Sequence, residues 1–256
     1  MTPESAWRLT WRRFRRSTLA RIGLWYLALL AVVTLGAPFF SPYDPNQLRL
    51  DVAYAPPQRL HLVDAEGRFH LRPFVYGLRA GIDPVTWARR YELDTSRRYP
   101  LRFFVRGWEY RFLGVWRTDI HLFGVDRGGT LHLLGTDKLG RDLFSRILHG
   151  GRVSLLIALA GAVASGVIGA VLGALSGYYG GRMDLLIQRV VELMQSFPAL
   201  PLWMALSVAI PKEWPTNAIL VAVVLIFALL GWTWLAREVR GKVLSVRAQD
   251  FVLAAR

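Results

Sequence analysis

Four long apolar segments dominate the chain. They run from about Leu19 to Phe40, Val153 to Ser176, Leu185 to Ile210 and Ala218 to Leu235. About 20 helical residues cross a bilayer core that is about 30 Å thick. The second and fourth segments contain no charged residue, whereas a soluble helix of that length would show a polar face. The pattern therefore predicts an all-α integral membrane bundle with four transmembrane helices.

A long polar stretch, residues 41–134, separates the first two apolar segments. Polar and apolar residues alternate within it, which is typical of β-strands. The alternation predicts hairpins over 59–71 and over 101–115, the second turning at Gly107. It also predicts short strands at 118–125 and 130–134, and one or two helical turns over 83–90. We therefore expect a β-rich insert between the first two transmembrane helices.

The N-terminus carries a cluster of basic residues, which are Arg8, Arg12, Arg13, Arg15, Arg16 and Arg21. Basic residues near the ends of spans remain in the cytoplasm, so the insert is expected outside. The insert has many arginines of its own, but long loops translocate largely regardless of their charge. The alternative is that the first apolar segment is a cleaved signal peptide. Pro38 follows the only small residues that could form a cleavage site, which argues against this alternative.

These patterns predict an order of segments along the chain. The expected order is a cytoplasmic basic N-terminus at 1–18, transmembrane helix 1 at 19–40, the extracytoplasmic β-rich insert at 41–134, an amphipathic interfacial helix at 135–152, transmembrane helices 2 to 4 within 153–236, and a cytoplasmic segment at 237–256.

The composition excludes several classes of chemistry. The chain has 256 residues, no cysteine and a formal net charge of +14. Without cysteine it has no disulfide, zinc–thiolate site, iron–sulfur cluster or cysteine nucleophile. It also lacks the phosphate-binding G-x-x-x-x-G-K-[ST], the zinc-protease H-E-x-x-H and the nucleophile G-x-S-x-G. We expect no enzyme and no catalytic or cofactor-binding residue. Nucleic-acid binding is not expected either, because the arginines are spread over both sides of the membrane.

Four of the five histidines fall in the insert, namely His61, His70, His121 and His132. Their positions do not follow a metal-ligand spacing. We therefore favour histidines on a sheet surface over a metal site.

Small residues recur at every fourth position of the second apolar segment, at Gly161, Ser165, Gly169, Gly173 and Gly177. Positions i and i+4 share one face of a helix. Such a stripe allows the backbone of another helix to approach closely. The favoured interpretation is helix packing.

The third apolar segment carries an unusual set of polar residues. By helical spacing, Asp184, Gln188, Glu192 and Gln195 fall roughly on one face, with Arg189 beside Glu192. Ionisable residues within a membrane face a bundle interior or a water-filled path. Two interpretations stay open: a helix lining a pore or gate, and a buried structural pair of Arg189 with Glu192. The prolines after Phe197 predict a kink. The candidates for a pathway or gate are Arg189, Glu192, Gln195 and Pro198.

A motif precedes the second apolar segment. Thr136 suits a helix N-cap, Leu139 and Leu143 recur at helical spacing, and Asp142 and Arg146 stand at i,i+4. The pattern predicts an amphipathic helix at the outer membrane interface.

From Gly135 to Leu155 the sequence reads G-T-D-x-x-G-R-D-x-x-S-R-x-x-x-G-x-R-x-S-L. It resembles the permeases of ATP-binding-cassette importers for dipeptides, oligopeptides and nickel, and looks like their C-type subunit. The motif residues are Gly135, Thr136, Asp137, Gly140, Arg141, Asp142, Ser145 and Arg146. The third apolar segment and the tail from Val246 are similar too.

The tail resembles the opening of the cytoplasmic E-A-A loop, whose helix docks on the ATPase. A helix capped by Ser245 is expected there, and Leu253 replaces the usual glutamate. The family has two further spans beyond this loop, so the resemblance implies that the sequence is truncated at Arg256. The residues expected to couple to the ATPase are Asp250, Phe251, Ala254, Ala255 and Arg256.

The resemblance implies half of a translocation pathway in the bacterial inner membrane. The expected partners are a B-type permease as heterodimer, two cytoplasmic ATPases, an external substrate-binding protein and membrane lipid. ATP would be hydrolysed by the partner subunits, so no cofactor is expected in this chain. Peptide is favoured as substrate over nickel. A membrane-anchored external interaction module is the alternative of a different class.

Overall fold

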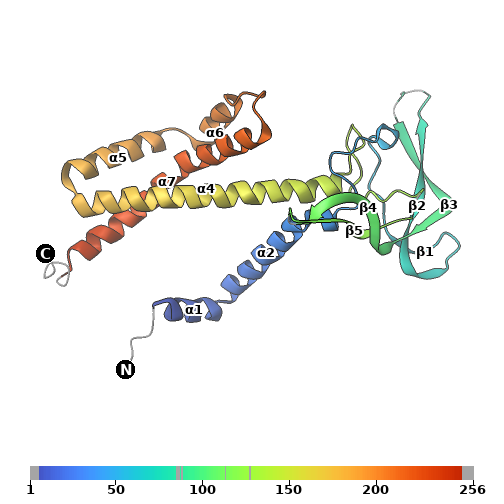
Figure 1. The fold of residues 1–256 in the computed structure, drawn as a ribbon, viewed down its shortest axis with the longest axis horizontal. Coiled ribbons are helices and arrows are strands. Elements are labelled where there is room, and N and C mark those ends of the chain that lie inside the picture. The colour runs from blue at the N-terminus through green and yellow to red at the C-terminus, as the bar shows by residue number, and fades with distance from the viewer. Residues whose placement is uncertain (1–5, 85–86, 88, 113, 127, 250–256) are drawn as a thin grey trace. The chain divides into compact units, whose positions relative to one another are not determined.

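The computed structural model describes residues 6–84, 87, 89–112, 114–126 and 128–249. The chain divides into two compact units, Met1–Val153 and Ser154–Arg256. Helix α4 (Leu143–Tyr179) begins in the first unit and ends in the second (Figure 1).

The first unit opens with helices. They are α1 (Ala6–Arg16), α2 (Thr18–Leu35), α3 (Ala37–Phe40) and the short 3-10 turn η1 (Leu50–Val52). Ser17 separates α1 from α2 and caps α2, because its hydroxyl accepts a hydrogen bond from the backbone N–H of Ala20 at 3.3 Å.

Five strands follow in the same unit. They are β1 (His61–Val63), β2 (Phe69–Ile82), β3 (Arg89–Pro100), β4 (Arg102–Phe112) and β5 (Trp116–Gly124). They form an antiparallel sheet in the order β1-β2-β3 and a separate antiparallel pair, β4-β5. The hairpin expected over 59–71 is present as β1 and β2.

The structure corrects three details of the expected strand pattern. Strand β4 runs straight through Gly107, which was expected to turn, and the chain turns between Phe112 and Trp116 instead. A Cβ atom on Gly107 would lie 2.6 Å from the ring of His121, so glycine there permits close cross-strand packing. Strand β2 ends at Ile82 and β3 begins at Arg89, and the described residues of 83–90 form no helix. Residues 130–134 do not form a strand.

The second unit is helical. It contains most of α4, then α5 (Gly181–Ser196), α6 (Ala199–Val208) and α7 (Thr216–Arg247). Among the described residues, α2, α4 and α7 are long and apolar enough to cross a membrane. The third apolar segment, in which the prolines after Phe197 predict a kink, is divided into α5 and α6. The break follows from Pro198, since the residue before a proline is pushed away from the helical region and Phe197 is extended.

A small core joins three helices of the second unit. Ile187 and Val191 from α5 pack with Trp232 and Ala236 from α7, and Leu172 and Leu175 of α4 lie against them. Most other apolar side chains of these helices are exposed. This distribution suits helices surrounded by lipid, where apolar side chains need no protein cover.

Candidate functional site

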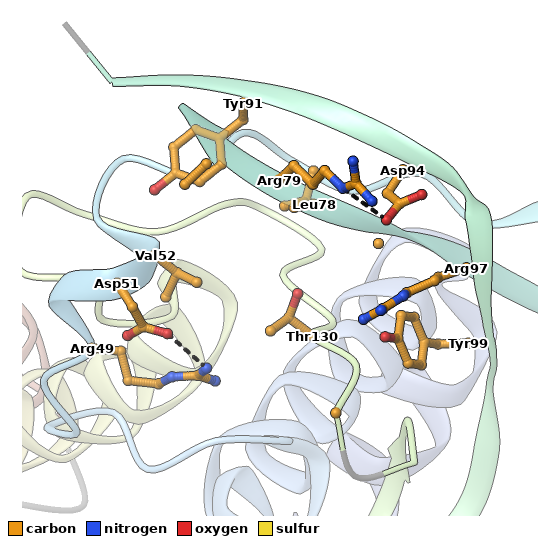
Figure 2. Close-up of a pocket in the computed structure, with 13 residues that line it drawn as sticks. Arg49, Asp51, Val52, Leu78, Arg79, Tyr91, Asp94, Arg97, Tyr99 and Thr130 are labelled. Carbon is orange, nitrogen blue, oxygen red and sulfur yellow. Dashed lines mark hydrogen bonds and ion pairs between the residues drawn. The ribbon is translucent and has the colours of Figure 1, made fainter. Parts of the chain in front are cut away.

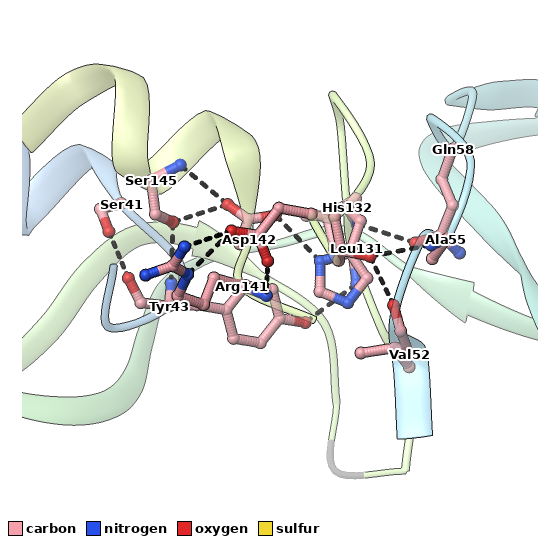
Figure 3. A network of polar contacts seen from close by, with 12 residues as sticks. Ser41, Tyr43, Val52, Ala55, Gln58, Leu131, His132, Arg141, Asp142 and Ser145 are labelled. Atoms are coloured by element: carbon pink, nitrogen blue, oxygen red, sulfur yellow. Dashed lines mark hydrogen bonds and ion pairs between the residues drawn. The ribbon is translucent and has the colours of Figure 1, made fainter. Parts of the chain in front are cut away.

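Residues 135–142 form a loop that packs on the segment 49–58 (Figure 3). The sequence predicted a helix there, and that prediction is wrong. Helix α4 begins only at Leu143 and then continues without a break, so no separate interfacial helix over 135–152 exists. The physical reason is that Gly135 and Gly140 have φ angles of +77° and +72°, outside the right-handed helical region.

Backbone hydrogen bonds hold this loop to the start of the insert. The N–H of Arg49 donates to Leu139 O at 3.1 Å, and the N–H of Tyr54 donates to Asp137 O at 3.0 Å. The hydroxyl of Thr136 accepts from the N–H of Ala55 at 2.8 Å. Thr136 therefore fastens the loop to the 49–58 segment and is not the predicted N-cap.

The two motif glycines are required by close contact as well as by their backbone angles. A Cβ atom on Gly140 would lie 1.7 Å from the carbonyl oxygen of Arg49, and one on Gly135 would lie 2.5 Å from that of Ala55. Both glycines therefore allow the two backbones to meet directly.

Asp142 is the residue that caps α4. Its Oδ2 accepts hydrogen bonds from the N–H of Ser145 at 2.8 Å and from the Ser145 hydroxyl at 2.7 Å. Its Oδ1 lies 2.9 Å from Nδ1 of His132. All three side chains are buried, so this cluster is a fixed joint between the insert and the first turn of α4.

Asp137 forms ion pairs with the two arginines Arg141 and Arg146. It accepts hydrogen bonds from the backbone N–H and the Nε of Arg141, at 3.0 and 2.8 Å, and it forms an ion pair with Arg146. The predicted pair of Arg146 with Asp142 is wrong, because Asp142 is occupied by His132 and Ser145. Partial burial alone would raise the pKa of Asp137, but the hydrogen bonds from Arg141 and Leu139 outweigh it and lower the pKa to about 2.

A pair of hydrogen bonds closes the base of the insert. The N–H of Gln58 donates to His132 O at 2.9 Å, and the N–H of His132 donates to the Gln58 side-chain oxygen at 2.8 Å. Gln58 and His132 are far apart in sequence, and their hydrogen bonds bring the two ends of the chain segment between them together.

The expectation of surface histidines is wrong for two of the four. His121 and His132 are buried, and His121 lies between the carbonyl oxygens of Pro38 and Trp108, at 2.9 and 3.0 Å. His70 is partly exposed and contacts Asp64 at 2.9 Å; that hydrogen bond is the main cause of the lowered pKa of the Asp64 carboxyl. In the part of the chain that the structure describes, no three His, Asp or Glu side chains are grouped as metal ligands would be.

The stripe of small residues on α4 faces α7 of the same chain. A Cβ atom on Gly169 would lie 2.7 Å from the carbonyl oxygen of Trp232, and one on Gly173 would lie 2.5 Å from that of Ala236. Gly161, Ser165 and Gly177 contact Phe227, Gly231 and Val243 in the same way. The stripe is therefore a helix-packing surface, and its partner is α7.

A polar network that the sequence did not reveal joins α4, α5 and α7. The Arg240 guanidinium donates to both oxygens of Asp184 at 2.6 Å. The Ser176 hydroxyl donates to Asp184 at 2.5 Å, and the Gln188 amide donates to Ser176 at 3.3 Å. Arg240 falls in the segment 237–256 that the sequence predicts to be cytoplasmic, and nothing in a single sequence pairs residues 56 positions apart.

The predicted pathway residues separate into two groups. Arg189 and Glu192 pair at 2.9 Å, but their side chains are 72% and 52% exposed, so the pair is not buried within this chain. The Gln195 amide instead donates to the Thr233 hydroxyl on α7 at 3.3 Å. Pro198 stands at the break before α6. Asp184, Gln188 and Gln195 thus face neighbouring helices, whereas Arg189 and Glu192 face outward.

The residues expected to couple to an ATPase, Asp250, Phe251, Ala254, Ala255 and Arg256, lie outside the described residues. Helix α7 runs uninterrupted to Arg247, so no new helix begins at Ser245. The Ser245 hydroxyl donates back to Lys242 O at 2.8 Å and caps nothing.

The insert contains a cavity of about 390 Å³, lined by β2, β3 and two neighbouring loops (Figure 2). Arg49 pairs with Asp51 at 3.2 Å, and Arg79 pairs with Asp94 at 3.1 Å. Arg97 has no ion pair with any residue that the structure describes, and its guanidinium points into the recess (Figure 2). A free guanidinium can bind an anion such as a carboxylate.

Comparisons with known proteins match both ends of the chain. Residues 5–57 match the N-terminal TM domain of oligopeptide transport permease C. Residues 169–256 match the binding-protein-dependent transport system inner membrane component.

Individual relatives agree with these matches. A dipeptide transport system permease protein of Lactococcus lactis is 29% identical over 96% of this chain and 60% of its own length. An oligopeptide transport system permease protein of Bacillus subtilis is 27% identical over 98% of this chain and 57% of its own length. A nickel transport system permease protein of Escherichia coli is 40% identical over 49% of this chain and 43% of its own length.

The chain thus spans about three fifths of the length of the first two relatives. The two domain matches and these relatives confirm the resemblance carried by residues 135–155. This chain belongs to the family of inner-membrane components of binding-protein-dependent transport systems.

Proposed function

We propose that this chain is a permease subunit of an ATP-binding-cassette importer that carries peptides across the bacterial inner membrane. The observation that carries the proposal is the family match over 169–256, which covers the α5–α7 contact and the Asp184–Arg240 pair. The names of the relatives that align with nearly the whole chain, dipeptide and oligopeptide permeases, support peptides as the substrate class.

The proposed topology has four passes, which are α2, α4, the broken pair α5 and α6, and α7. The basic face of α1, with Arg13, Arg15 and Arg16 in its last turn, supports a cytoplasmic N-terminus. The insert then lies outside. The break at Pro198 supports a hinge in the third pass, and Arg189, Glu192 and Gln195 are proposed to line the pathway or its gate.

The proposed transport complex contains four further protein subunits and is surrounded by membrane lipid. A B-type permease supplies the other half of the pathway, two cytoplasmic ATPases hydrolyse ATP, and an external binding protein delivers the peptide. The segment with Asp250, Phe251, Ala254, Ala255 and Arg256 is proposed to dock on an ATPase. The chain itself performs no chemistry and holds no cofactor, so its task is alternating access.

Nickel is the second candidate substrate, because a nickel permease is among the more identical relatives over the half of this chain that it matches. The two substrates can be separated by direct uptake measurements.

The test is ATP-dependent uptake by the complete complex in proteoliposomes, with labelled dipeptide and nickel offered separately. We expect uptake of the peptide and none of nickel. Asp184→Asn removes a charge from the contact of α5 with α7, so it should lower uptake severalfold. Arg182→Gln removes an exposed charge from the same helix, outside the proposed pathway, and is the matched control for the Asp184 effect. Failure of the complete complex to take up peptide would refute the proposal.

A further inference from the structure

Strands β4 and β5 form a two-stranded ribbon that touches helices at two places. His121 on β5 lies 2.9 Å from the carbonyl oxygen of Pro38, and the rings of Phe104 and Phe39 are 6.3 Å apart. Trp108, whose ring lies 5.4 Å from that of His121, makes the second contact, with its ring 6.1 Å from that of His149 in the first turns of α4. In Figure 1 the ribbon lies beside the end of α2.

Both contacts fall where an apolar helix becomes polar. Helix α2 is long and apolar enough to cross a membrane, and Pro38 follows directly after it. In α4 the uncharged stretch starts at Val153, so His149 lies about one turn before it. Two independent helices therefore place the ribbon at the level of the lipid head groups.

The exposed side chains of the ribbon suit that level. Phe103 and Trp116 are 63% and 66% exposed, and aromatic side chains are favoured at the boundary between lipid and water. Arg111 and Arg117 are directly opposite each other on the two strands. Like charges in that arrangement repel, and neither arginine has an ion pair with a described residue.

We propose that the β4–β5 ribbon is a membrane-interface anchor that rests on the outer leaflet. Phe103 and Trp116 enter the head-group region. Arg117 follows Trp116 on β5 and therefore leaves the other face of the ribbon, so the long side chains of the Arg111–Arg117 pair bend around the edge of the ribbon to bind the phosphate of an anionic lipid. A phosphate between two guanidinium groups relieves their repulsion and accepts their hydrogen bonds. This role does not depend on which substrate the permease carries.

The absence of native cysteine allows a direct test. Phe103→Cys and Trp116→Cys are spin-labelled in the complete complex, which is reconstituted in vesicles of phosphatidylethanolamine and phosphatidylglycerol. Collisions with oxygen, which concentrates in lipid, are compared with collisions with a water-soluble nickel chelate. Leu71→Cys is the matched control, because Leu71 is a 91% exposed strand residue in the other sheet.

We expect a higher ratio of oxygen to nickel-chelate collisions at positions 103 and 116 than at 71. Removing phosphatidylglycerol should lower this ratio at 116, and Arg111→Gln with Arg117→Gln should abolish that dependence on the lipid. Ratios equal to that at 71 would show that the ribbon stands in water. Labels shielded from both reagents would show that another protein covers it. Either result would overturn the proposal.

Discussion

Gly140 shows how one residue fixes the joint between the insert and the membrane helices. Its φ of +72° disfavours any side chain, and an added Cβ atom would overlap the carbonyl group of Arg49. We therefore expect Gly140→Ala to lower the free energy of unfolding by about 3 kcal/mol or more. Thermal unfolding in detergent micelles measures the change.

Gly67→Ala is the matched control for this substitution. Gly67 has a similar φ of +80°, but nothing lies within 4 Å of its added Cβ atom. Gly67→Ala should lower the free energy of unfolding only by the cost of a side chain at a left-handed backbone angle, about 1 kcal/mol. Equal losses at the two positions would mean that the contact with Arg49 does not matter.

Asp137 makes a prediction about pH. Its pKa in the folded protein, about 2, lies below the ordinary value of 3.8. A lowered pKa stabilises the fold fully above the ordinary value, and this stabilisation is lost as the pH falls through the folded value. We therefore expect the unfolding temperature to fall between about pH 4 and pH 2. Asp137→Asn should flatten that part of the profile, and a variant with an unchanged acid slope would contradict the assignment.

The sequence identified these residues but not what each one does. The i,i+4 spacing of Asp142 and Arg146 suggested a helical pair, yet the left-handed glycines at 135 and 140 take the chain out of the helix. Asp142 is consequently free to cap α4, and Arg146 reaches Asp137 instead. Glycine permits many backbone angles, so its presence alone does not reveal which angle the fold uses.

At the level of elements, the contact of α4 with α7 depends on the small residues between them. The chain lacks cysteine, so Ser165→Cys with Gly231→Cys provides a reporter. The Ser165 Cβ atom lies 3.2 Å from a Cβ built on Gly231, close to the spacing in a disulfide. This pair should cross-link in membranes under mild oxidant. Adding Gly173→Leu should lower the yield strongly, because the side chain would meet the backbone of Ala236.

Gly166→Leu is the control for the same reporter, since it lies on α4 with nothing within 4 Å of its added Cβ atom. Its cross-linking yield should match that of the parent pair. If Gly173→Leu left the yield unchanged as well, close packing would not hold the two helices together.

The helices also show which features the hydrophobic pattern predicts and which it does not. The uncharged stretches within α4 and α7, Val153 to Ser176 and Ala218 to Leu235, were recognisable from composition alone. The spacing of the glycines correctly indicated helix packing. The identity of the partner helix was not recognisable, because a four-residue repeat describes one surface only. The division into α5 and α6 needed the backbone at Phe197, although Pro198 had already indicated a kink.

For the whole molecule, the orientation in the membrane is the main prediction. The arginines of α1 should hold the N-terminus in the cytoplasm and the insert outside. A cysteine at Thr130 should therefore react with an impermeant thiol reagent in intact cells, and a cysteine at Thr10 should react only after lysis. The opposite labelling would reverse the proposed topology.

Much of the insert escaped prediction because its strands pair over distances that periodicity does not measure. The β1–β2 hairpin was recognisable from its short turn. The sequence pattern predicts a turn at Gly107, but the absence of a side chain there leaves room for the ring of His121 on the opposite strand. His121 and His132 are buried by contacts with Pro38 and Asp142, which are distant in sequence or in an unexpected loop.

The hydrogen bonds between Gln58 and His132 have an evolutionary consequence. They bring the two ends of a long chain segment to one point, so the length of that segment is independent of the spacing between the helices that it connects. Insertions and deletions within 59–131 can then accumulate without shifting the membrane core. The segment 59–131 becomes an exchangeable module, and a chimaera that swaps it at Gln58 and His132 keeps the contacts that hold the start of α4.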